Sequence, residues 1–154
     1  MEFESGDISQ ILKEVVEDYR KNLDDKNIDV EFKSNTENRY FASIDPIIYD
    51  AFSNLLSNAI KYNNESEKIT IDIFDKDRFW KITVTDYGTG IPYNNKQRVF
   101  ERFYRTKNNN YLGSGLGLAI VKKIVDLHGG EVGVSDNPEG KGSRFWITLK
   151  KSSP

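Results

Sequence analysis

The 154-residue chain contains no cysteine, no long apolar run and no excess of basic residues. The lack of cysteine excludes disulfides, thiolate zinc sites and a cysteine nucleophile, and it fits a reducing compartment. No apolar run approaches the roughly 20 residues that span a bilayer. The acidic start Met1-Glu2-Phe3-Glu4-Ser5 is unlike a signal peptide. With 22 Lys and Arg against 24 Asp and Glu, the chain also lacks the basic surface of a nucleic-acid-binding protein.

The composition is that of one globular domain. Apolar residues make up 37% and charged residues 30% of the chain, which is too apolar for a disordered protein. A chain of this length is expected to fold as a single unit and to bury a core without a disulfide or a structural metal.

Apolar residues at steps of three and four predict three helices, over about 7–25, 46–62 and 115–128. Candidate caps lie near the start of the first two helices: Asp7 or Ser9, and Asp45 followed by Pro46. Alternating apolar and polar residues predict strands at about 27–32, 39–44, 69–73, 80–85, 131–135 and 143–149. Helices interspersed with strands indicate a mixed sheet with helices packed on one face.

One face of the second helix carries Asn54, Asn58 and Lys61 and is turned away from the apolar stripe. An amide oxygen can ligate Mg²⁺ and a lysine can contact a phosphate, so this face is able to hold a metal-bound polyphosphate. Taken alone, the three residues are more simply interpreted as an ordinary solvated helix face.

Two glycine-containing segments follow. Asp86-Tyr87-Gly88-Thr89-Gly90-Ile91-Pro92 places a carboxylate at a strand end, where it can accept a hydrogen bond from an exocyclic amine, although a simple turn is the alternative. Gly113-Ser114-Gly115-Leu116-Gly117-Leu118 opens the third helix, and free N–H groups there can bind an anion. It is neither a Walker loop nor a convincing dinucleotide fingerprint. The long irregular stretch at 87–115 is more typical of a functional lid than of a connector.

Four blocks occur in order, at 54–62, 86–91, 99–105 and 113–118. They resemble the N, G1, F and G2 boxes of the histidine-kinase catalytic domain, a member of the GHKL superfamily. The resemblance extends to Asp45-Pro46, to His128-Gly129-Gly130-Glu131 and to the segment 140–145, and therefore covers nearly the whole chain. It implies that residues 1–154 are an ATP-binding catalytic domain without the histidine-bearing dimerisation helices. The implied Bergerat fold is an α/β two-layer sandwich: a mixed, largely antiparallel sheet of about five strands covered on one face by three helices, with an ATP lid.

The resemblance also implies ATP and Mg²⁺ as ligands and gives roles to single residues. Asn58 would ligate Mg²⁺, Asn54 would shape the same polar face, and Lys61 would contact phosphate oxygens. Asp86 would recognise the adenine amino group. Tyr62 would lie against the nucleotide, and Gly88 and Gly90 would form the floor beneath adenine. Phe100 and Phe103 would anchor the lid, with Arg102 or Arg105 available to the phosphates. Gly113, Gly115 and Gly117 would wrap the triphosphate, and Ile91, Ser114, Leu116 and Leu118 would be further nucleotide-binding positions.

Residue 54 favours a kinase over an ATPase. ATP-hydrolysing relatives in the superfamily carry a glutamate four residues before the metal-ligating asparagine, as general base for water. An amide cannot take a proton at neutral pH, so Asn54 disfavours hydrolysis. The chain departs from the family at Asn63-Asn64, where a small hydroxyl residue and a proline are usual. This departure bears on how the helix ends more than on activity.

The phosphoacceptor has to be supplied by another domain. His128 is the only histidine, and its position after the third helix favours a structural role. The resemblance implies a histidine-containing dimerisation domain as partner, a response regulator indirectly, no nucleic acid and no direct membrane contact. It also implies a cytoplasmic domain that is monomeric alone, and leaves membrane anchoring of the parent open. The alternatives are a nucleotide-binding module without transfer activity, a GHKL ATPase, and a protein-serine kinase of the anti-sigma type.

Overall fold

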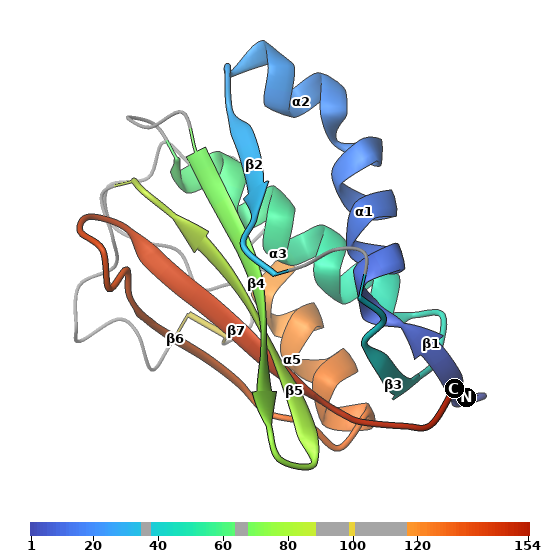
Figure 1. Ribbon diagram of the computed structural model, residues 1–154. Coiled ribbons are helices and arrows are strands. Elements are labelled where there is room, and N and C mark those ends of the chain that lie inside the picture. The colour runs from blue at the N-terminus through green and yellow to red at the C-terminus, as the bar shows by residue number, and fades with distance from the viewer. Residues whose placement is uncertain (35–37, 64–67, 89–98, 101–116) are drawn as a thin grey trace.

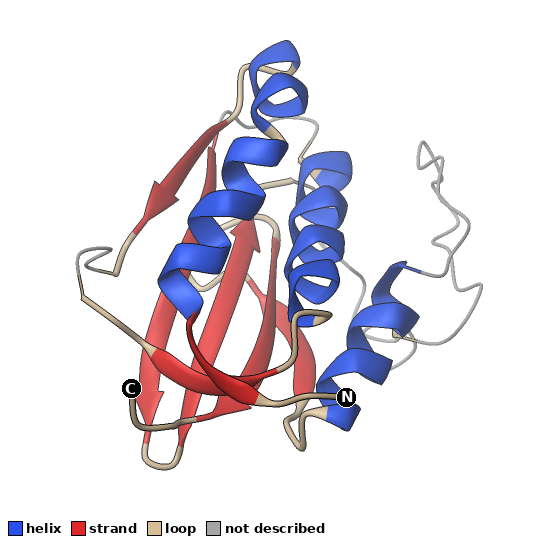
Figure 2. Cartoon of the chain, turned by 90° about the vertical axis from the view of Figure 1, so that its right-hand side faces the viewer, coloured by secondary structure: helices blue, strands red, loops and turns tan. Residues whose placement is uncertain are grey.

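The computed structural model describes residues 1–34, 38–63, 68–88, 99–100 and 117–154. Helices lie on one side of a twisted sheet, so the molecule has two layers (Figures 1 and 2). The elements in chain order are β1 (Glu4–Asp7), α1 (Ile8–Asp18), α2 (Arg20–Asp25), β2 (Asp29–Phe32), β3 (Phe41–Ile44), α3 (Ile48–Tyr62), β4 (Lys68–Lys76), β5 (Phe79–Asp86), α5 (Gly117–Leu127), β6 (Val132–Asp136) and β7 (Ser143–Lys150).

The main sheet has five strands in the order β2-β4-β5-β7-β6. β2 runs parallel to β4, and the other neighbours are antiparallel. This confirms the predicted mixed, largely antiparallel sheet. The predicted strand at 39–44 forms as β3, but it pairs with β1 in a separate two-stranded sheet. β1 was not predicted because its sequence, Glu-Ser-Gly-Asp, has no apolar alternation and becomes a strand only through this pairing.

The first predicted helix is divided at Tyr19, whose φ of −97° and ψ of 9° end α1 before α2 begins. The phenol of Tyr19 is hydrogen-bonded to the Ser53 hydroxyl on α3 at 2.8 Å, a tertiary contact that periodicity cannot reveal. Asp7 caps α1, as one of the two predicted candidates, by accepting from the N–H of Ser9 at 3.1 Å. The predicted cap at Asp45 is wrong: α3 begins at Ile48, its N-cap is Ile47 and no side chain caps it. Asp45 instead accepts from the N–H of Ile47 at 2.9 Å, in the turn before the helix.

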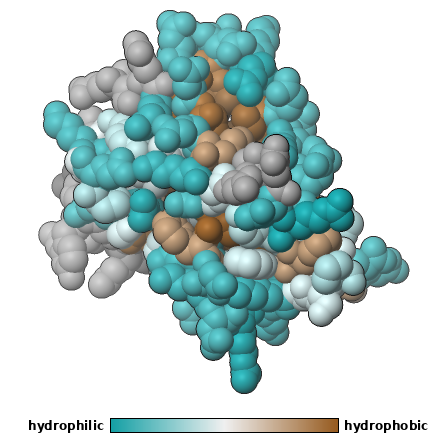
Figure 3. Space-filling model, viewed as in Figure 1, coloured by the Kyte–Doolittle hydropathy of each residue, from teal (hydrophilic) through white to brown (hydrophobic). Residues whose placement is uncertain are grey.

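The core lies between the sheet and the helices. The inward side chains of β4, β5 and β7 are buried against α3 and α5, as their alternation predicted. They are Ile69, Ile71, Ile82, Val84, Phe145, Ile147 and Leu149. In the view of Figure 1, the molecular surface is largely hydrophilic, and apolar side chains gather where β2 lies beside α1 (Figure 3). In the part of the chain that the structure describes, no helix is both long and apolar enough to cross a membrane.

Candidate functional site

The carboxylate of Asp86 lies at the end of β5, and only 1% of the residue is exposed. Its Oδ1 accepts hydrogen bonds from the backbone N–H groups of Gly88, at 3.1 Å, and Ser143, at 3.2 Å. Its Oδ2 is buried and accepts no hydrogen bond from any described residue. Burial raises the pKa of Asp86 from its ordinary value of 3.8 to about 6, although the two backbone hydrogen bonds act in the opposite direction. A buried acceptor without a donor is costly, so Oδ2 marks a position where an N–H group of a ligand fits.

Gly88 brings the end of β5 against the end of α3. A Cβ atom at residue 88 would overlap the carbonyl oxygen of Tyr62, the last residue of the helix. Only glycine lets the two backbones approach this closely. The contact places the carboxylate of Asp86 near the last turn of α3, which also carries Lys61.

The polar face of α3 is not a simply solvated surface. Asn58 is only 4% exposed, whereas Asn54 is half-buried and Lys61 is exposed. The Nδ2 atom of Asn54 donates to the carbonyl of Asp50 at 2.7 Å. Its Oδ1 atom lies 3.2 Å from where a Cβ of Gly117 would stand, so this side chain touches the first residue of α5. The structure therefore brings together the second predicted helix and the start of the third.

The first residues of the predicted F box pack against the sheet. Val99 is 3% exposed, and the ring of Phe100 meets that of Phe145 edge-to-face, with 6.1 Å between the centroids. Leu118 in the first turn of α5 is buried. The other predicted site residues of the lid and glycine segments lie outside the described residues: Gly90, Ile91, Arg102, Phe103, Arg105, Gly113, Ser114, Gly115 and Leu116.

Sequence reasoning missed two asparagines that contact the Asp86 segment. The Oδ1 atom of Asn63 accepts from the N–H of Tyr87 at 3.2 Å, so this residue does more than end the helix. The Nδ2 atom of Asn137 donates to the carbonyl of Asp86 at 3.3 Å. Asn137 opens an Asn-Pro turn, and this turn signal was present in the sequence. What the turn touches depends on the tertiary structure.

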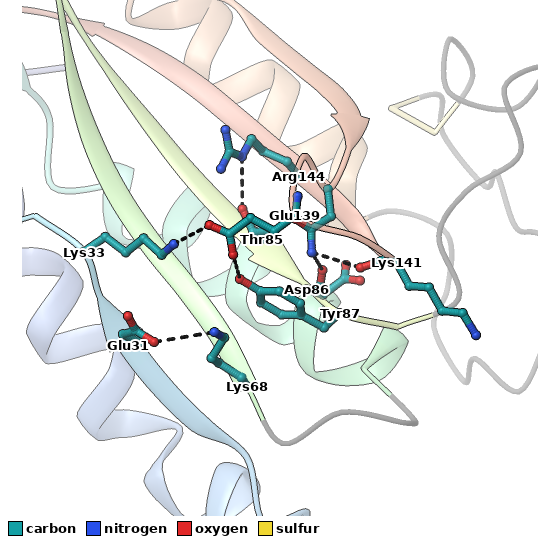
Figure 4. A network of polar contacts seen from close by, with 10 residues as sticks. Glu31, Lys33, Lys68, Thr85, Asp86, Tyr87, Glu139, Lys141 and Arg144 are labelled. Atoms are coloured by element: carbon teal, nitrogen blue, oxygen red, sulfur yellow. Dashed lines mark hydrogen bonds and ion pairs between the residues drawn. The ribbon is translucent and has the colours of Figure 1, made fainter.

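The β6–β7 turn also contacts Asp86. The N–H of Ser143 donates to Asp86, and the buried hydroxyl of Ser143 has no hydrogen-bond partner within the described ranges. Around the turn, Glu139 accepts from Lys33 at 2.7 Å and from the phenol of Tyr87 at 3.2 Å (Figure 4). The hydrogen bond from Lys33 is the main reason that the pKa of Glu139 lies below its ordinary value. These groups are largely exposed and contribute little stability, but they tie Tyr87 to the turn.

His128 has the predicted structural role. Its Nε2 accepts from the backbone N–H of Asp45 at 3.1 Å, and its Nδ1 lies 2.8 Å from the carbonyl oxygen of Ile124. Because Nε2 is an acceptor, the proton has to be on Nδ1, which donates to the carbonyl. Both nitrogens of this 4%-exposed side chain are thus used within the fold. Neither is available to attack a phosphoryl group.

The donor set on α3 would fit a magnesium ion that is also held by a polyphosphate. Among the described residues, no group of three or more His, Cys, Asp or Glu side chains is arranged to hold a metal. Mg²⁺ often takes only one or two protein ligands and fills its other positions with phosphate oxygens and water. The amide oxygen of Asn58 is a suitable single ligand of this kind, and it sits on the helix beside the Asp86 segment.

Comparisons with known proteins identify the family. Residues 43–153 match the model of the "Histidine kinase-, DNA gyrase B-, and HSP90-like ATPase" family. The sensor protein kinase PmrB of Pseudomonas aeruginosa is 31% identical over 154 residues, which is 99% of this chain and 32% of the relative, so the chain spans about a third of that protein. The mycobacterial sensor histidine kinase MprB has a TM-score of 0.85 with 29% identity, covering 99% of both chains. Full-length ShkA, solved in complex with AMPPNP, has a TM-score of 0.81 with 25% identity, covering 99% of this chain and 32% of ShkA. This chain is therefore an ATP-binding domain of the histidine kinase-, DNA gyrase B- and HSP90-like ATPase family, and its relatives are sensor histidine kinases.

Proposed function

We propose that this chain binds ATP with Mg²⁺ and transfers the γ-phosphoryl group to a histidine on a separate dimerisation domain of a two-component sensor kinase. The observation that carries the proposal is the buried Oδ2 of Asp86, an acceptor that has no donor among the described residues. The exocyclic amine of adenine supplies the missing N–H. The sensor kinase relatives and the AMPPNP complex of ShkA support the same assignment. We also propose that this domain lies on the cytoplasmic side of its parent, where ATP is available.

The chain's own residues would bind and orient the nucleotide. Asp86 would hold adenine above Gly88, while Lys61 and an arginine, Arg102 or Arg105, would offset charge on the phosphates. Asn58 would hold Mg²⁺, which lowers the repulsion between the phosphate oxygens. An imidazole nitrogen of the partner would form the new bond to the γ-phosphorus as the bond to the bridging oxygen breaks and ADP leaves. Catalysis of this kind depends mainly on positioning and charge neutralisation.

Asn54 supports transfer over hydrolysis. Its amide cannot remove a proton from water, and its Nδ2 is already used in a hydrogen bond to Asp50 within the helix. Water near the γ-phosphate would therefore stay unactivated, which preserves the phosphoryl group for histidine. We expect slow phosphate release by the isolated chain.

The test is to mix the chain with the dimerisation domain of its parent kinase, labelled ATP and Mg²⁺, and then with the cognate response regulator. The expected result is an acid-labile phosphohistidine on the dimerisation domain, followed by phosphate on the regulator. Tight ATP binding without transfer would support a nucleotide-binding module instead. Repeated turnover of ATP by the isolated chain would support an ATPase, and an acid-stable phosphoserine would support the anti-sigma type of kinase.

Asn58→Asp is expected to change the metal dependence of ATP binding. A carboxylate in place of the buried amide adds a negative charge beside the phosphates and a harder ligand for the cation. Calorimetric titration of ATP over a series of Mg²⁺ and Mn²⁺ concentrations measures the effect, with Asn22→Asp on the exposed face of α2 as a charge-matched control. An Mg²⁺ response identical to that of the unmodified chain would remove Asn58 from the metal site.

His128→Ala is expected to cost about 2 kcal/mol of stability and to leave phosphotransfer intact. The substitution removes both hydrogen bonds of the imidazole and leaves the part-buried N–H of Asp45 without its acceptor. Urea unfolding measures the stability, and the mixing assay, run below the unfolding temperature of the variant, measures the transfer. Loss of transfer in a folded variant would assign His128 a part in the reaction.

A further inference from the structure

Buried asparagines hold both ends of the peptide group that joins Asp86 to Tyr87. The carbonyl of Asp86 accepts from Nδ2 of Asn137 at 3.3 Å, and the N–H of Tyr87 donates to Oδ1 of Asn63 at 3.2 Å. Asn63 and Asn137 are 3% and 4% exposed. Asn63 follows α3 and Asn137 opens the β6–β7 turn, so two segments 74 positions apart in the chain are hydrogen-bonded to a single peptide group.

Each of the two asparagines is itself fixed in place. Nδ2 of Asn137 also donates to the carbonyl of Lys141 at 2.9 Å, and its Oδ1 accepts from the N–H of Glu139 at 2.9 Å. Nδ2 of Asn63 donates to the carbonyl of Lys68, at the start of β4, at 3.1 Å. A buried network with its donors and acceptors paired in this way is rigid. The orientation of the Asp86–Tyr87 peptide is therefore set by α3, β4 and the β6–β7 turn together.

The turn also packs directly on the carbonyl that Asn137 contacts. Gly142 has a φ of +111°, and a Cβ there would overlap the carbonyl oxygen of Asp86. The next residue, Ser143, donates its N–H to Oδ1 of the same aspartate. By docking the turn on this carbonyl, Asn137 brings the N–H of Ser143 to one carboxylate oxygen, while the other, Oδ2, has no donor among the described residues.

We propose that Asn63 and Asn137 are positioning residues that orient the Asp86 carboxylate toward the amino group of adenine, and so set the preference of this chain for adenine over guanine nucleotides. The inference rests on the proposed function, because it assumes that Asp86 accepts the adenine amine. Adenine presents an N6 amine, whereas guanine presents an O6 acceptor at the equivalent position, which a carboxylate repels. Rotation of the peptide group would move Oδ2 away from the amine, and small displacements in a binding site cost large factors.

The test compares Asn137→Ser and Asn63→Ser with Asn22→Ser, an exposed control on α2. Serine is too short to span the present contacts, yet its hydroxyl still suits a turn. Calorimetry with Mg²⁺ gives the Kd for ATP, GTP and inorganic tripolyphosphate. We expect ATP binding to weaken about tenfold in each site variant, with tripolyphosphate unchanged, so that the ATP-to-GTP preference falls by about the same factor.

A second readout separates positioning from a general loss of structure. In Asn137→Ser the carboxylate loses its hydrogen bond from Ser143, so the pH midpoint below which ATP affinity falls is expected to rise above that of the unmodified chain. If Asn137→Ser does not fold, the isosteric Asn137→Asp replaces it, with the same expected loss of base preference.

Three results would overturn the inference. The positioning role is refuted if folded site variants retain the ATP-to-GTP ratio and the pH midpoint of the control, or if they lose affinity for ATP and for tripolyphosphate to the same degree. Failure of the unmodified chain to bind ATP at all would overturn the proposed function and the inference with it. When the unmodified chain binds and discriminates but the variants match it, only the positioning role is refuted.

Discussion

Asp86→Asn is expected to weaken ATP binding roughly 10- to 100-fold, because it removes a charged acceptor for the adenine amine. Binding of inorganic tripolyphosphate, which has no base, is expected to stay unchanged. The substitution is nearly isosteric, and its Oδ1 atom can still accept from Gly88 and Ser143, as the carboxylate does. Calorimetry with both ligands separates recognition of the base from recognition of the phosphates.

The same substitution is expected to stabilise the free chain at neutral pH. The folded-state pKa of Asp86 is about 6 against an ordinary 3.8, so ionising this group at pH 7 costs the fold about 3 kcal/mol. The stability linked to the protonated form of Asp86 is therefore fully present below pH 3.8 and is lost as the pH rises through 6. Asparagine does not titrate, but it buries an N–H₂ group, so we expect a net gain of about 1 to 2 kcal/mol.

Urea unfolding at pH 4 and pH 7.5 measures this gain, which should appear only at the higher pH. Asp25→Asn, at an exposed position in α2, is the control, and its effect on stability should be small at both pH values. Unchanged ATP affinity in Asp86→Asn would contradict the assignment of the base site. A stability gain of equal size at both pH values would contradict the buried, raised-pKa carboxyl as its cause.

Gly88→Ala is expected to destabilise the chain by about 2 to 3 kcal/mol and to weaken ATP binding. The added methyl group would overlap the carbonyl oxygen of Tyr62, and this obstacle is backbone that cannot rotate away. The end of β5 has to move from the end of α3, which separates Asp86 from the polar helix face. Urea unfolding and ATP calorimetry measure the two effects.

Gly140→Ala is the comparison for this prediction. An added Cβ at residue 140 meets no atom within 4 Å, although the φ of +151° there is strained for alanine. Its cost is therefore confined to the backbone, at about 1 kcal/mol, and ATP binding should be retained. Equal losses for the two substitutions would show that crowding at the helix end is not what makes residue 88 sensitive.

Periodicity in the sequence predicted the elements that bury one face. The alternation of β4, β5 and β7 and the apolar stripe of α3 are local patterns, so the two-layer fold followed from them together with the family resemblance. β1 was not predicted because it forms by pairing with β3. The break at Tyr19, whose phenol is hydrogen-bonded to Ser53, was not predicted either. Contacts between segments that are distant in the chain leave no local pattern.

For the candidate site too, some features could be predicted from the sequence and others only from the tertiary structure. By itself the sequence predicted which side chains carry the chemistry, since Asn58, Asp86 and the glycine segments stand in the order of the family's motifs. Only the tertiary structure decided that Asn58 is buried, that one oxygen of Asp86 lacks a donor among the described residues, and that Asn63 and Asn137 hold the peptide beside it. Residue type follows from the chain alone, whereas burial and hydrogen-bond partners depend on which distant segments meet, and these are set by packing of the whole domain.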